Sequence, residues 1–318
     1  MKEIVTLTLN PTVDLIAEIG RVEPDRKLRV HSPRYEPGGG GINVSRAIHK
    51  LGGESSAVYT AGGPTGDMLE QLLDEEGVDH HPVAIDAWTR QNPNIFETES
   101  DHAYRFILPG PELDKRVLQR CAETLFQEAD AVEYLVLSGS LPRGLPADSY
   151  NDIIDQAVDR GIKVIFDASG ESLRQGLDRG VYLVKPNLRE LHDLLGREVE
   201  SDEQIAAAAR ELIENDRTEV VLVSVGGGGA LLVTADEQDR IPSPTVPIRS
   251  RIGAGDSLVG ALSLALSRGW PIRQAARFGV AAGAAAVKTP GTQLCRRDDT
   301  EALYKELQHQ AEEEARRG

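Results

Sequence analysis

Cysteine, methionine and tryptophan are scarce in this chain, with two residues of each among 318. Cys121 and Cys295 lie far apart and form no Cys-x-x-Cys pair, which argues against a disulfide framework and against a cysteine metal site. Basic residues are also few, because 35 Lys and Arg face 51 Asp and Glu. The formal net charge of -16 argues against nonspecific binding to nucleic acid and against an anionic membrane surface. No apolar run reaches the length that spans a bilayer. Together these absences favour a soluble, cytoplasmic protein.

Apolar runs with strand character alternate with helix-period segments along most of the chain. The expected strands are Ile4–Leu9, Ser56–Tyr59, Tyr134–Leu137, Lys163–Phe166, Val181–Val184, Val220–Val225 and Ala230–Val233. The expected helices are Val44–Leu51, Gly66–Glu76, Lys115–Gln127, Ala147–Arg160, Glu203–Glu214, Asp256–Ser267, Ile272–Val287 and Thr300–Arg316. This alternation predicts an α/β fold with a mostly parallel central sheet flanked by helices.

Two segments, Thr12–Tyr35 and Ala87–Leu108, interrupt the alternation with mixed polar and apolar residues and no helical period. We interpret residues of about 12–35 and 87–108 as insertions that form a small β-sheet lid. Ordinary surface hairpins are the alternative. Because there is no proline-rich linker, low-complexity tract or internal repeat, residues 1–318 are expected to form a single domain with a lid.

Glycines concentrate where strand-like runs meet loops, in Gly38–Gly41, Gly226–Gly229 and Gly253-Ala254-Gly255. Bare glycine backbone lets a ligand approach closely. The three tracts contain no Gly-x-Gly-x-x-Gly in register, and the chain has no Gly-x-x-x-x-Gly-Lys-Ser/Thr. A dinucleotide-dependent dehydrogenase and a P-loop enzyme are therefore both disfavoured.

The third tract is followed at once by Asp256 and a small-residue helix. The free N–H groups of a helix N-terminus attract an anion, and a carboxylate beside them can remove a proton. Phosphoryl transfer to a hydroxyl needs that pairing. The alternative is a plain strand-to-helix turn in which Asp256 is the N-cap.

Two long motifs carry a resemblance to a known family. Residues 36–47, Glu-Pro-Gly-Gly-Gly-Gly-Ile-Asn-Val-Ser-Arg-Ala, resemble the N-terminal signature of the ribokinase-like (PfkB) carbohydrate kinases. Residues 250–257, Ser-Arg-Ile-Gly-Ala-Gly-Asp-Ser, resemble the C-terminal one, and Lys185-Pro186-Asn187-Leu188-Arg189-Glu190 lies between them. The resemblance covers essentially the whole chain and is nearest to the 6-phosphofructokinase branch. It implies a ribokinase-like fold.

For the reaction, the resemblance implies that Asp256 is the general base and that the backbone N–H groups of Gly253, Ala254 and Gly255 form an anion hole. The residues that it places around the sugar phosphate are Asp14, Gly39, Gly40, Asn43, Arg90, Arg105, Ser138 and Gly139. Arg90 and Arg105 would hold the 6-phosphate, because guanidinium binds phosphate through two parallel bonds. On spacing alone, a turn residue is the better interpretation of Asp14.

The resemblance also implies an ATP site, formed by Lys27, Lys185, Asn187, Ser224, Gly226, Gly229, Ile248, Val280 and Gly283. Asn187 and Glu190 would hold Mg²⁺ with its waters. A helix cap with a capping-box glutamate explains the same Asn-x-x-Glu spacing. Ser250 could offer oxygen to K⁺, but Lys288 nearby places a positive charge against such a site, so the sequence leaves potassium open. Arg251 departs from the family pattern and has no assigned role.

The expected activity is ATP-dependent phosphorylation of fructose 6-phosphate at its 1-hydroxyl, giving fructose 1,6-bisphosphate and ADP. The alternatives are a tagatose-6-phosphate kinase, a 1-phosphofructokinase, or a non-catalytic sugar sensor on the same fold. The expected partners are the sugar phosphate and ATP, with a second copy of the chain joined through the lid as a homodimer. Lys27 would reach the nucleotide of the neighbouring subunit. Neither nucleic acid nor a membrane is expected as a partner.

Overall fold

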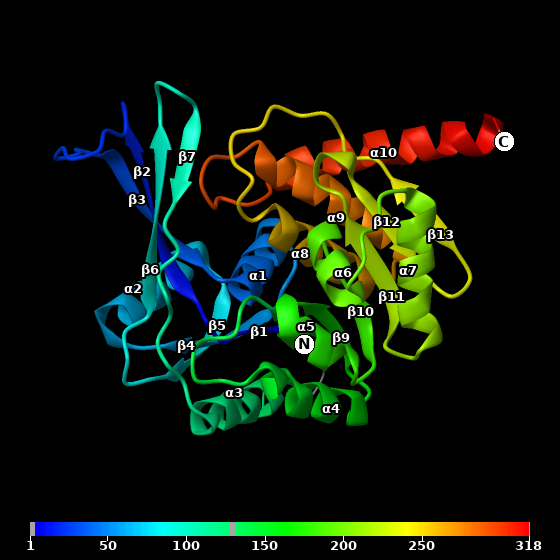
Figure 1. The fold of residues 1–318 in the computed structure, drawn as a ribbon, viewed down its shortest axis with the longest axis horizontal. Coiled ribbons are helices and arrows are strands. Elements are labelled where there is room, and N and C mark those ends of the chain that lie inside the picture. Colours follow the sequence, from blue (N-terminus) through cyan, green and yellow to red (C-terminus); the bar gives the residue numbers. More distant parts are fainter. Residues whose placement is uncertain (1–3, 128–131, 318) are drawn as a thin grey trace.

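The computed structural model describes residues 4–127 and 132–317, which form one large sheet with helices on both faces and one small sheet beside it (Figure 1). The large sheet has nine strands in the order β13-β12-β11-β10-β9-β8-β1-β4-β5. Their bounds are β1 Ile4–Thr8, β4 Ser56–Ala61, β5 Asp79–Ala84, β8 Tyr134–Ser138, β9 Lys163–Asp167, β10 Val181–Val184, β11 Thr218–Ser224, β12 Ala230–Val233 and β13 Gln238–Ile241. All neighbours pair in parallel except β11 with β12 and β12 with β13. The predicted mostly parallel sheet is confirmed.

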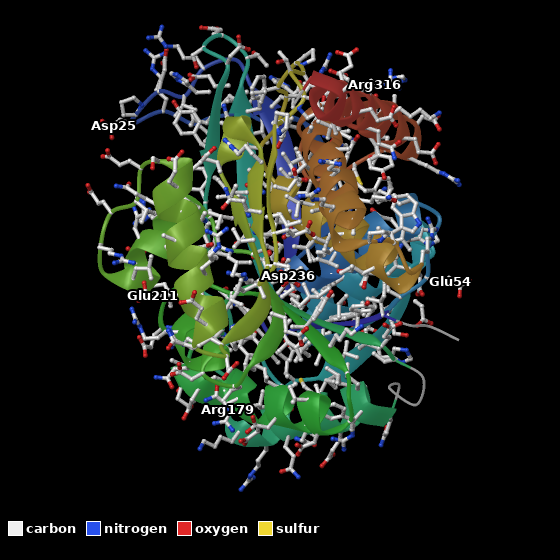
Figure 2. All side chains as sticks on the ribbon, turned by 90° about the vertical axis from the view of Figure 1, so that its right-hand side faces the viewer. Asp25, Glu54, Arg179, Glu211, Asp236 and Arg316 are labelled. Atoms are coloured by element: carbon white, nitrogen blue, oxygen red, sulfur yellow. The ribbon has the colours of Figure 1, made fainter. Side chains whose placement is uncertain are left out.

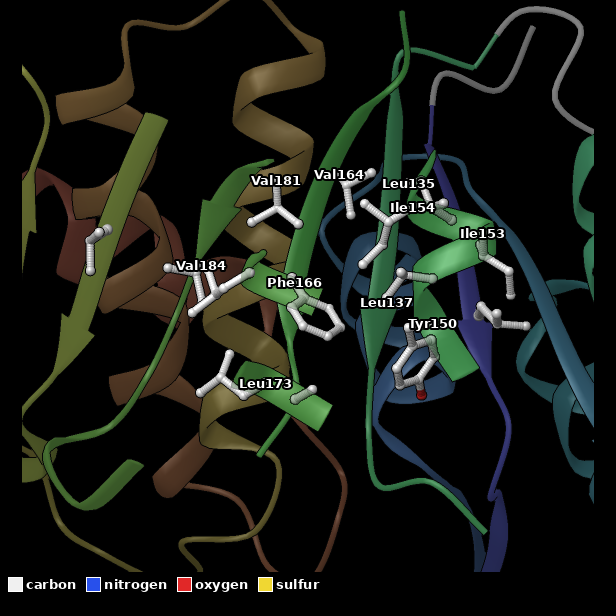
Figure 3. Packing of buried hydrophobic residues seen from close by; sticks show 14 of the residues in the cluster. Leu135, Leu137, Tyr150, Ile153, Ile154, Val164, Phe166, Leu173, Val181 and Val184 are labelled. Carbon is white, nitrogen blue, oxygen red and sulfur yellow. The ribbon is translucent and has the colours of Figure 1, made fainter. Parts of the chain in front are cut away.

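Burial explains why these runs form strands. Every residue of β1, β4 and β8 is buried, as expected for a parallel sheet covered on both faces. Phe166 of β9 packs edge-on against Tyr150, and Ile153 and Ile154 cover the same face (Figure 3). The parallel strands leave their carboxyl ends at one edge of the sheet, where open α/β folds bind ligands.

The helices divide between the two faces. The core on one face includes residues of α3, α4, α5, α6 and α7, and the core on the other includes residues of α1, α8, α9 and α10. The bounds are α1 Gly40–Lys50, α2 Gly63–Glu76, α3 Lys115–Gln127, α4 Asn151–Asp159, α5 Gly170–Leu177, α6 Leu188–Leu195, α7 Asp202–Glu214, α8 Ala254–Ser267, α9 Ile272–Val287 and α10 Arg297–Arg317. Short 3-10 turns occupy Ala147–Tyr150 and Gly226–Gly228.

The small sheet contains β2 Thr12–Ile19, β3 His31–Gly38, β6 Arg90–Glu97 and β7 His102–Arg105, in the order β3-β2-β6-β7. All four strands come from the two segments predicted to form a lid. β2 pairs in parallel with β6 along its whole length, which joins two hairpins into one sheet. Separate surface hairpins are therefore the wrong interpretation.

Other boundaries differ from the prediction. β5, β13, α5 and α6 were not expected, because they are short and lack a clear period. The helix expected from Val44 starts at Gly40, since the tetraglycine run itself enters α1. The helix expected over Ala147–Arg160 is a 3-10 turn followed by α4.

Charged side chains cover the outside of the molecule. Glu54, Arg179 and Glu211 are exposed and lie at its periphery (Figure 2). Within the described part of the chain, no helix is long and apolar enough to cross a membrane.

Candidate active site

A cavity of about 420 Å³ opens where the carboxyl ends of the strands meet the lid. β8 ends at Ser138 and β9 ends at Asp167, so both strands point polar side chains into this edge. All of the residues predicted to surround the sugar phosphate line the cavity, together with Asp256. These residues are Asp14, Gly39, Gly40, Asn43, Arg90, Arg105, Ser138 and Gly139.

The tetraglycine run fits tightly against the sheet. A Cβ on Gly40 would lie 2.4 Å from Oγ of Ser138 and 2.7 Å from the backbone nitrogen of Gly139. Gly39 has a φ of 120°, which a side chain rarely tolerates. These contacts explain why glycine stands at both positions where α1 begins.

Asp256 lies in the first turn of α8, half-buried, and accepts a hydrogen bond of 2.8 Å from Nδ2 of Asn43. The N-cap of α8 is Gly253, with a φ of 75°, so the interpretation of Asp256 as the N-cap is wrong. The side chain of Asp256 lines the cavity instead. The first N–H groups of α8 have no partner within the helix, which suits them to an anion.

Burial raises the pKa of Asp256 to about 6, and the charge of Asp167 acts in the same direction. The hydrogen bond from Asn43 and the charges of Lys185 and Arg105 oppose that rise. A carboxyl group with a pKa near 6 is ionised at neutral pH and is a stronger base than an ordinary aspartate.

Asp167, which the sequence analysis missed, forms a buried ion pair with Lys185, with 3.0 Å between Oδ1 and Nζ. Burial opposes the charge of Lys185, but Asp167 outweighs it and raises the pKa of the lysine. Ser138 donates a hydrogen bond of 3.4 Å to Asp167. The available signal was its position at the end of a buried strand, one residue beyond the predicted strand Lys163–Phe166.

Asp14 lies inside β2 and is 2% exposed, so its interpretation as a turn residue is wrong. Burial raises the pKa of its carboxyl group, while the charge of Arg105 and a hydrogen bond from Asn92 lower it. Its Oδ1 atom is buried and has no hydrogen-bond partner among the described residues. An unsatisfied buried oxygen that lines a cavity suits a ligand hydroxyl.

The two predicted phosphate ligands differ. Arg90 donates to the carbonyl oxygens of Asn10 at 2.8 Å, Pro11 at 3.3 Å and Leu108 at 3.2 Å, which ties β6 to two loops. Arg105 is exposed at the end of β7, and its guanidinium has no hydrogen bond or ion pair with any residue that the structure describes. Arg105 is therefore the freer of the two cations for a bound anion.

A second cavity of about 480 Å³ lies on the other side of the α8 N-terminus. It is lined by seven of the residues predicted for the nucleotide, namely Asn187, Ser224, Gly226, Gly229, Ile248, Val280 and Gly283. Lys185 lies near the same helix end, since a Cβ on Gly255 would be 3.7 Å from its Nζ atom. Lys27 is exposed in the loop between β2 and β3 and lines neither cavity.

Arg251, which had no role predicted from the sequence, lines both cavities. Ser250, beside it, accepts a hydrogen bond of 3.2 Å from the backbone N–H of Ile252. Lys288, whose charge was expected to weaken a cation site near Ser250, is paired with Asp299.

Asn187 and Glu190 form a capping box at the start of α6. Oδ1 of Asn187 accepts from the N–H of Glu190, and Oε2 of Glu190 accepts from the N–H of Asn187, both at 2.9 Å. The capping interpretation is thus confirmed, and burial raises the pKa of Glu190. No group of three or more His, Cys, Asp or Glu arranged for a metal occurs in the part of the chain that the structure describes. A cation here would need most of its ligands from elsewhere.

The chain is similar to known proteins over most of its length. Two relatives named "ATP-dependent 6-phosphofructokinase isozyme 2" are similar over nearly the whole chain. The one from Mycobacterium tuberculosis is 43% identical over 95% of this chain and 88% of its own length. The one from Escherichia coli is 41% identical over 96% and 98%. A "1-phosphofructokinase" from Xanthomonas campestris is 34% identical over 82% and 83%.

Crystal structures of phosphofructokinase-2 from Escherichia coli have the same fold at 40% identity. They include a complex with potassium (TM-score 0.93), a complex with fructose-6-phosphate (0.91) and a tetrameric inhibited form (0.91), each covering 97% of this chain and 100% of that one. The pattern of the pfkB family of carbohydrate kinases matches residues 5–299. This chain therefore belongs to the pfkB family of carbohydrate kinases.

Proposed function

We propose that the protein transfers the γ-phosphoryl group of ATP to the 1-hydroxyl of fructose 6-phosphate. The observation that carries this proposal is the position of Asp256. It lies at the N-terminus of α8 with one cavity on each side, and one of these cavities contains three arginines and an unsatisfied aspartate oxygen. The names of two relatives that are 43% and 41% identical support the same activity.

In the proposed reaction, the carboxylate of Asp256 takes the proton of the sugar hydroxyl as the hydroxyl oxygen attacks the γ-phosphorus. The new oxygen–phosphorus bond forms while the bond between the phosphorus and the leaving ADP oxygen breaks. The backbone N–H groups of Gly253, Ala254 and Gly255 stabilise the charge on the transferred group. Asp14 and Asn43 orient the sugar, and Arg105 binds its 6-phosphate with Arg90 alongside.

The nucleotide would occupy the second cavity, with the adenine near Ile248, Val280 and Gly283 and the phosphates toward Lys185. Asn187 and Glu190 fit Mg²⁺ as partial ligands, because an amide and a single carboxylate leave room for phosphate oxygens and waters. Bound there, the ion would neutralise phosphate charge. Potassium remains a prediction, now without the objection from Lys288, whose charge is paired with Asp299.

The lid supports a homodimer. Leu28, Val30, Tyr35 and Phe106 are apolar yet 42 to 53% exposed on the lid segments, and a second copy would cover them. Lys27 lies in the same region, far in sequence from the nucleotide residues, and would act from the partner copy. Sedimentation velocity tests this assembly, and a monomer at micromolar concentration would contradict it.

The substrate is tested by coupled ADP release over fructose 6-phosphate, tagatose 6-phosphate, fructose 1-phosphate, fructose and ribose. We expect fructose 6-phosphate to exceed fructose by about tenfold to a hundredfold or more in kcat/KM, because each charge-assisted contact to phosphate contributes about 1.5–3 kcal/mol. A preference for fructose 1-phosphate would favour the 1-phosphofructokinase alternative. Absence of turnover with every sugar would favour the sensor.

Asp256→Asn separates catalysis from stability. We expect kcat to fall on the order of 10²- to 10⁴-fold, since the general base is gone. The same change should raise the unfolding temperature at pH 8, because the folded-state pKa lies above the unfolded value and the carboxylate is destabilising once ionised. That gain should shrink as the pH falls from 7 to 5, because the folded state takes up the proton there while the unfolded chain stays ionised. Full activity of the variant would remove Asp256 from the mechanism.

Arg105→Gln should raise KM for fructose 6-phosphate by about tenfold to a hundredfold, through the loss of a charge-assisted contact. Turnover of unphosphorylated fructose should change far less at pH 8, where Asp256 is ionised with or without the charge of Arg105. Arg21→Gln is the matched control, because it removes the same charge from an exposed site just after β2 that does not line the cavity. Equal effects of the two variants would point to general electrostatics instead of phosphate binding.

Arg251→Gln tests the residue that lines both cavities. We expect kcat/KM to fall about tenfold or more, because the guanidinium is placed to contact phosphate oxygens as the group passes between the substrates. Arg249→Gln is the control, since Arg249 is exposed two residues away and lines neither cavity. If both variants kept their activity, Arg251 would have no part in transfer.

A further inference from the structure

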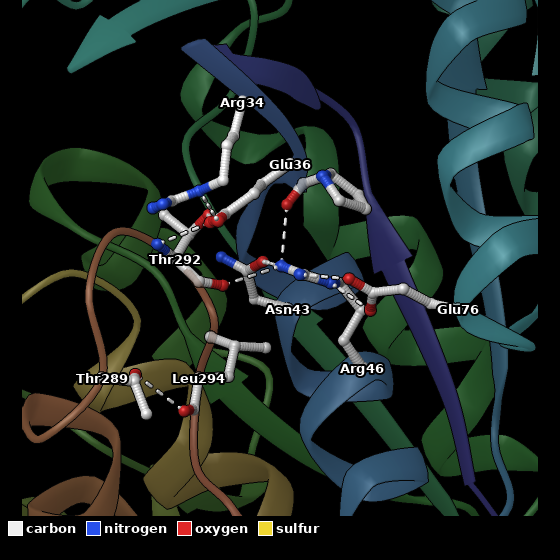
Figure 4. Close-up of polar contacts among 9 residues, drawn as sticks. Arg34, Glu36, Asn43, Arg46, Glu76, Thr289, Thr292 and Leu294 are labelled. Atoms are coloured by element: carbon white, nitrogen blue, oxygen red, sulfur yellow. Dashed lines mark hydrogen bonds and ion pairs between the residues drawn. The ribbon is translucent and has the colours of Figure 1, made fainter. Parts of the chain in front are cut away.

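Arg46 is the largest of the side chains that are almost fully buried, with 1% of its surface exposed, and it lies in α1 one turn after Asn43. Its Nε and Nη2 atoms donate to the two carboxylate oxygens of Glu76 at 2.8 and 2.6 Å. Its Nη1 atom donates to the carbonyl oxygen of Pro37 at 2.8 Å, to that of Thr292 at 3.1 Å and to Oδ1 of Asn43 at 3.0 Å (Figure 4). The Glu76 pair balances the charge, so the contact with Asn43 is not needed for neutrality.

The contact with Asn43 determines which way its amide group points. A guanidinium carries only hydrogen-bond donors, so it donates to the oxygen of an amide and repels the amide's NH₂ group. With Oδ1 held by Arg46, Nδ2 is left to donate to Oδ2 of Asp256 at 2.8 Å. A reversed amide would direct NH₂ at the guanidinium and oxygen at the carboxylate, and both contacts would be unfavourable.

We propose that Arg46 is a positioning residue of phosphoryl transfer, which acts through Asn43 to hold a hydrogen-bond donor against the carboxylate of Asp256. Arg46 reaches the reacting atoms through one intermediary and does not line the cavity. The inference rests on the proposed role of Asp256 as the base. Arg46 then contributes to the reaction as well as to the packing of α1.

The charges around Asp256 set what should happen without Arg46. Asp167 raises the pKa of Asp256, whereas Asn43, Lys185 and Arg105 lower it. If the amide of Asn43 is free to turn, its oxygen can face Asp256, where it favours the protonated carboxyl group. The pKa of Asp256 should then rise, and the acid limb of the pH–activity profile should move to higher pH.

An effect of the Arg46 charge on other carboxyl groups is the competing explanation for a change in activity. Arg46 also lowers the pKa of Asp14, which Glu36 raises, and Lys50 and His49 act on Glu76. A charge effect on Asp14 would change substrate binding whether or not Asn43 is present. An effect through Asn43 requires the amide, and this difference separates the two routes.

The test uses Arg46→Met combined with Glu76→Met, because removing Arg46 alone would leave the half-buried Glu76 unpaired. We expect kcat to fall about tenfold or more and the acid limb to move up by about one pH unit or more, as the carboxylate loses a hydrogen bond. Glu76→Gln, which leaves the guanidinium and Asn43 in place, should not move the limb. Arg46→Lys should give an intermediate shift.

Asn43→Ala completes a double-mutant cycle. Alone it should move the limb as far as the Arg46/Glu76 variant, and adding that variant to it should produce no further shift. A folded Arg46/Glu76 variant with an unchanged limb would show that Arg46 is only structural. A shift that persists in the Asn43→Ala background would show that it acts by charge.

A measurement of stability, which needs no turnover, distinguishes this inference from the proposed function. The stabilisation produced by Asp256→Asn should level off at a higher pH in the Arg46/Glu76 background than in the parent, because it follows the pKa of Asp256. If the parent fails to phosphorylate fructose 6-phosphate but this shift is present, the function is wrong and the positioning stands. If the parent is active and the shift is missing, the reverse holds.

Discussion

The hydrogen bond from Asn43 to Asp256 joins helices α1 and α8 through two residues that lie 213 positions apart in the sequence. α1 brings the tetraglycine edge of the cavity of about 420 Å³, and α8 brings the helix N-terminus that lies between the two cavities. Their spacing is fixed by close packing, since a Cβ on Gly260 of α8 would lie 2.9 Å from the Cβ of Ala47 in α1. Each helix also starts after a glycine with a positive φ. In the proposed reaction, the alignment of hydroxyl, base and anion hole would therefore depend on helix packing more than on any loop.

Charge is the second constraint, because a chain with a net charge of -16 must bind two phosphorylated ligands. The buried Lys185 is already paired with Asp167, and Arg46 with Glu76. In the proposed reaction, attraction for incoming phosphate would therefore come from Arg105, Arg251 and the helix N-terminus. Since neither arginine has an ion pair among the described residues, binding need not first break an internal contact.

The sequence indicated most of the fold and of the cavity lining, because buried parallel strands and glycine signatures are local patterns. It failed where the deciding contact is distant. Asp14 reads as a turn residue until β6 pairs beside β2 and buries it. Asp167 stands out only through its ion pair with Lys185, which lies on the loop after the next strand. β5 was missed because Asp79, His80, His81 and Pro82 lack strand character and are held by pairing with β4.

Asn187 and Glu190 show why a motif alone could not decide between structure and chemistry. The spacing of a capping box and that of a shared cation site are the same, and the first is present here. The capping hydrogen bonds leave both side chains with free lone pairs. An ionised carboxylate has further lone pairs, and the amide oxygen has a second one. Glu190 lines the cavity of about 420 Å³ and Asn187 lines the one of about 480 Å³. The cap therefore holds two oxygen atoms in fixed positions between the two cavities, and in the proposed reaction the contacts that stabilise the helix would also position the ligands of a cation.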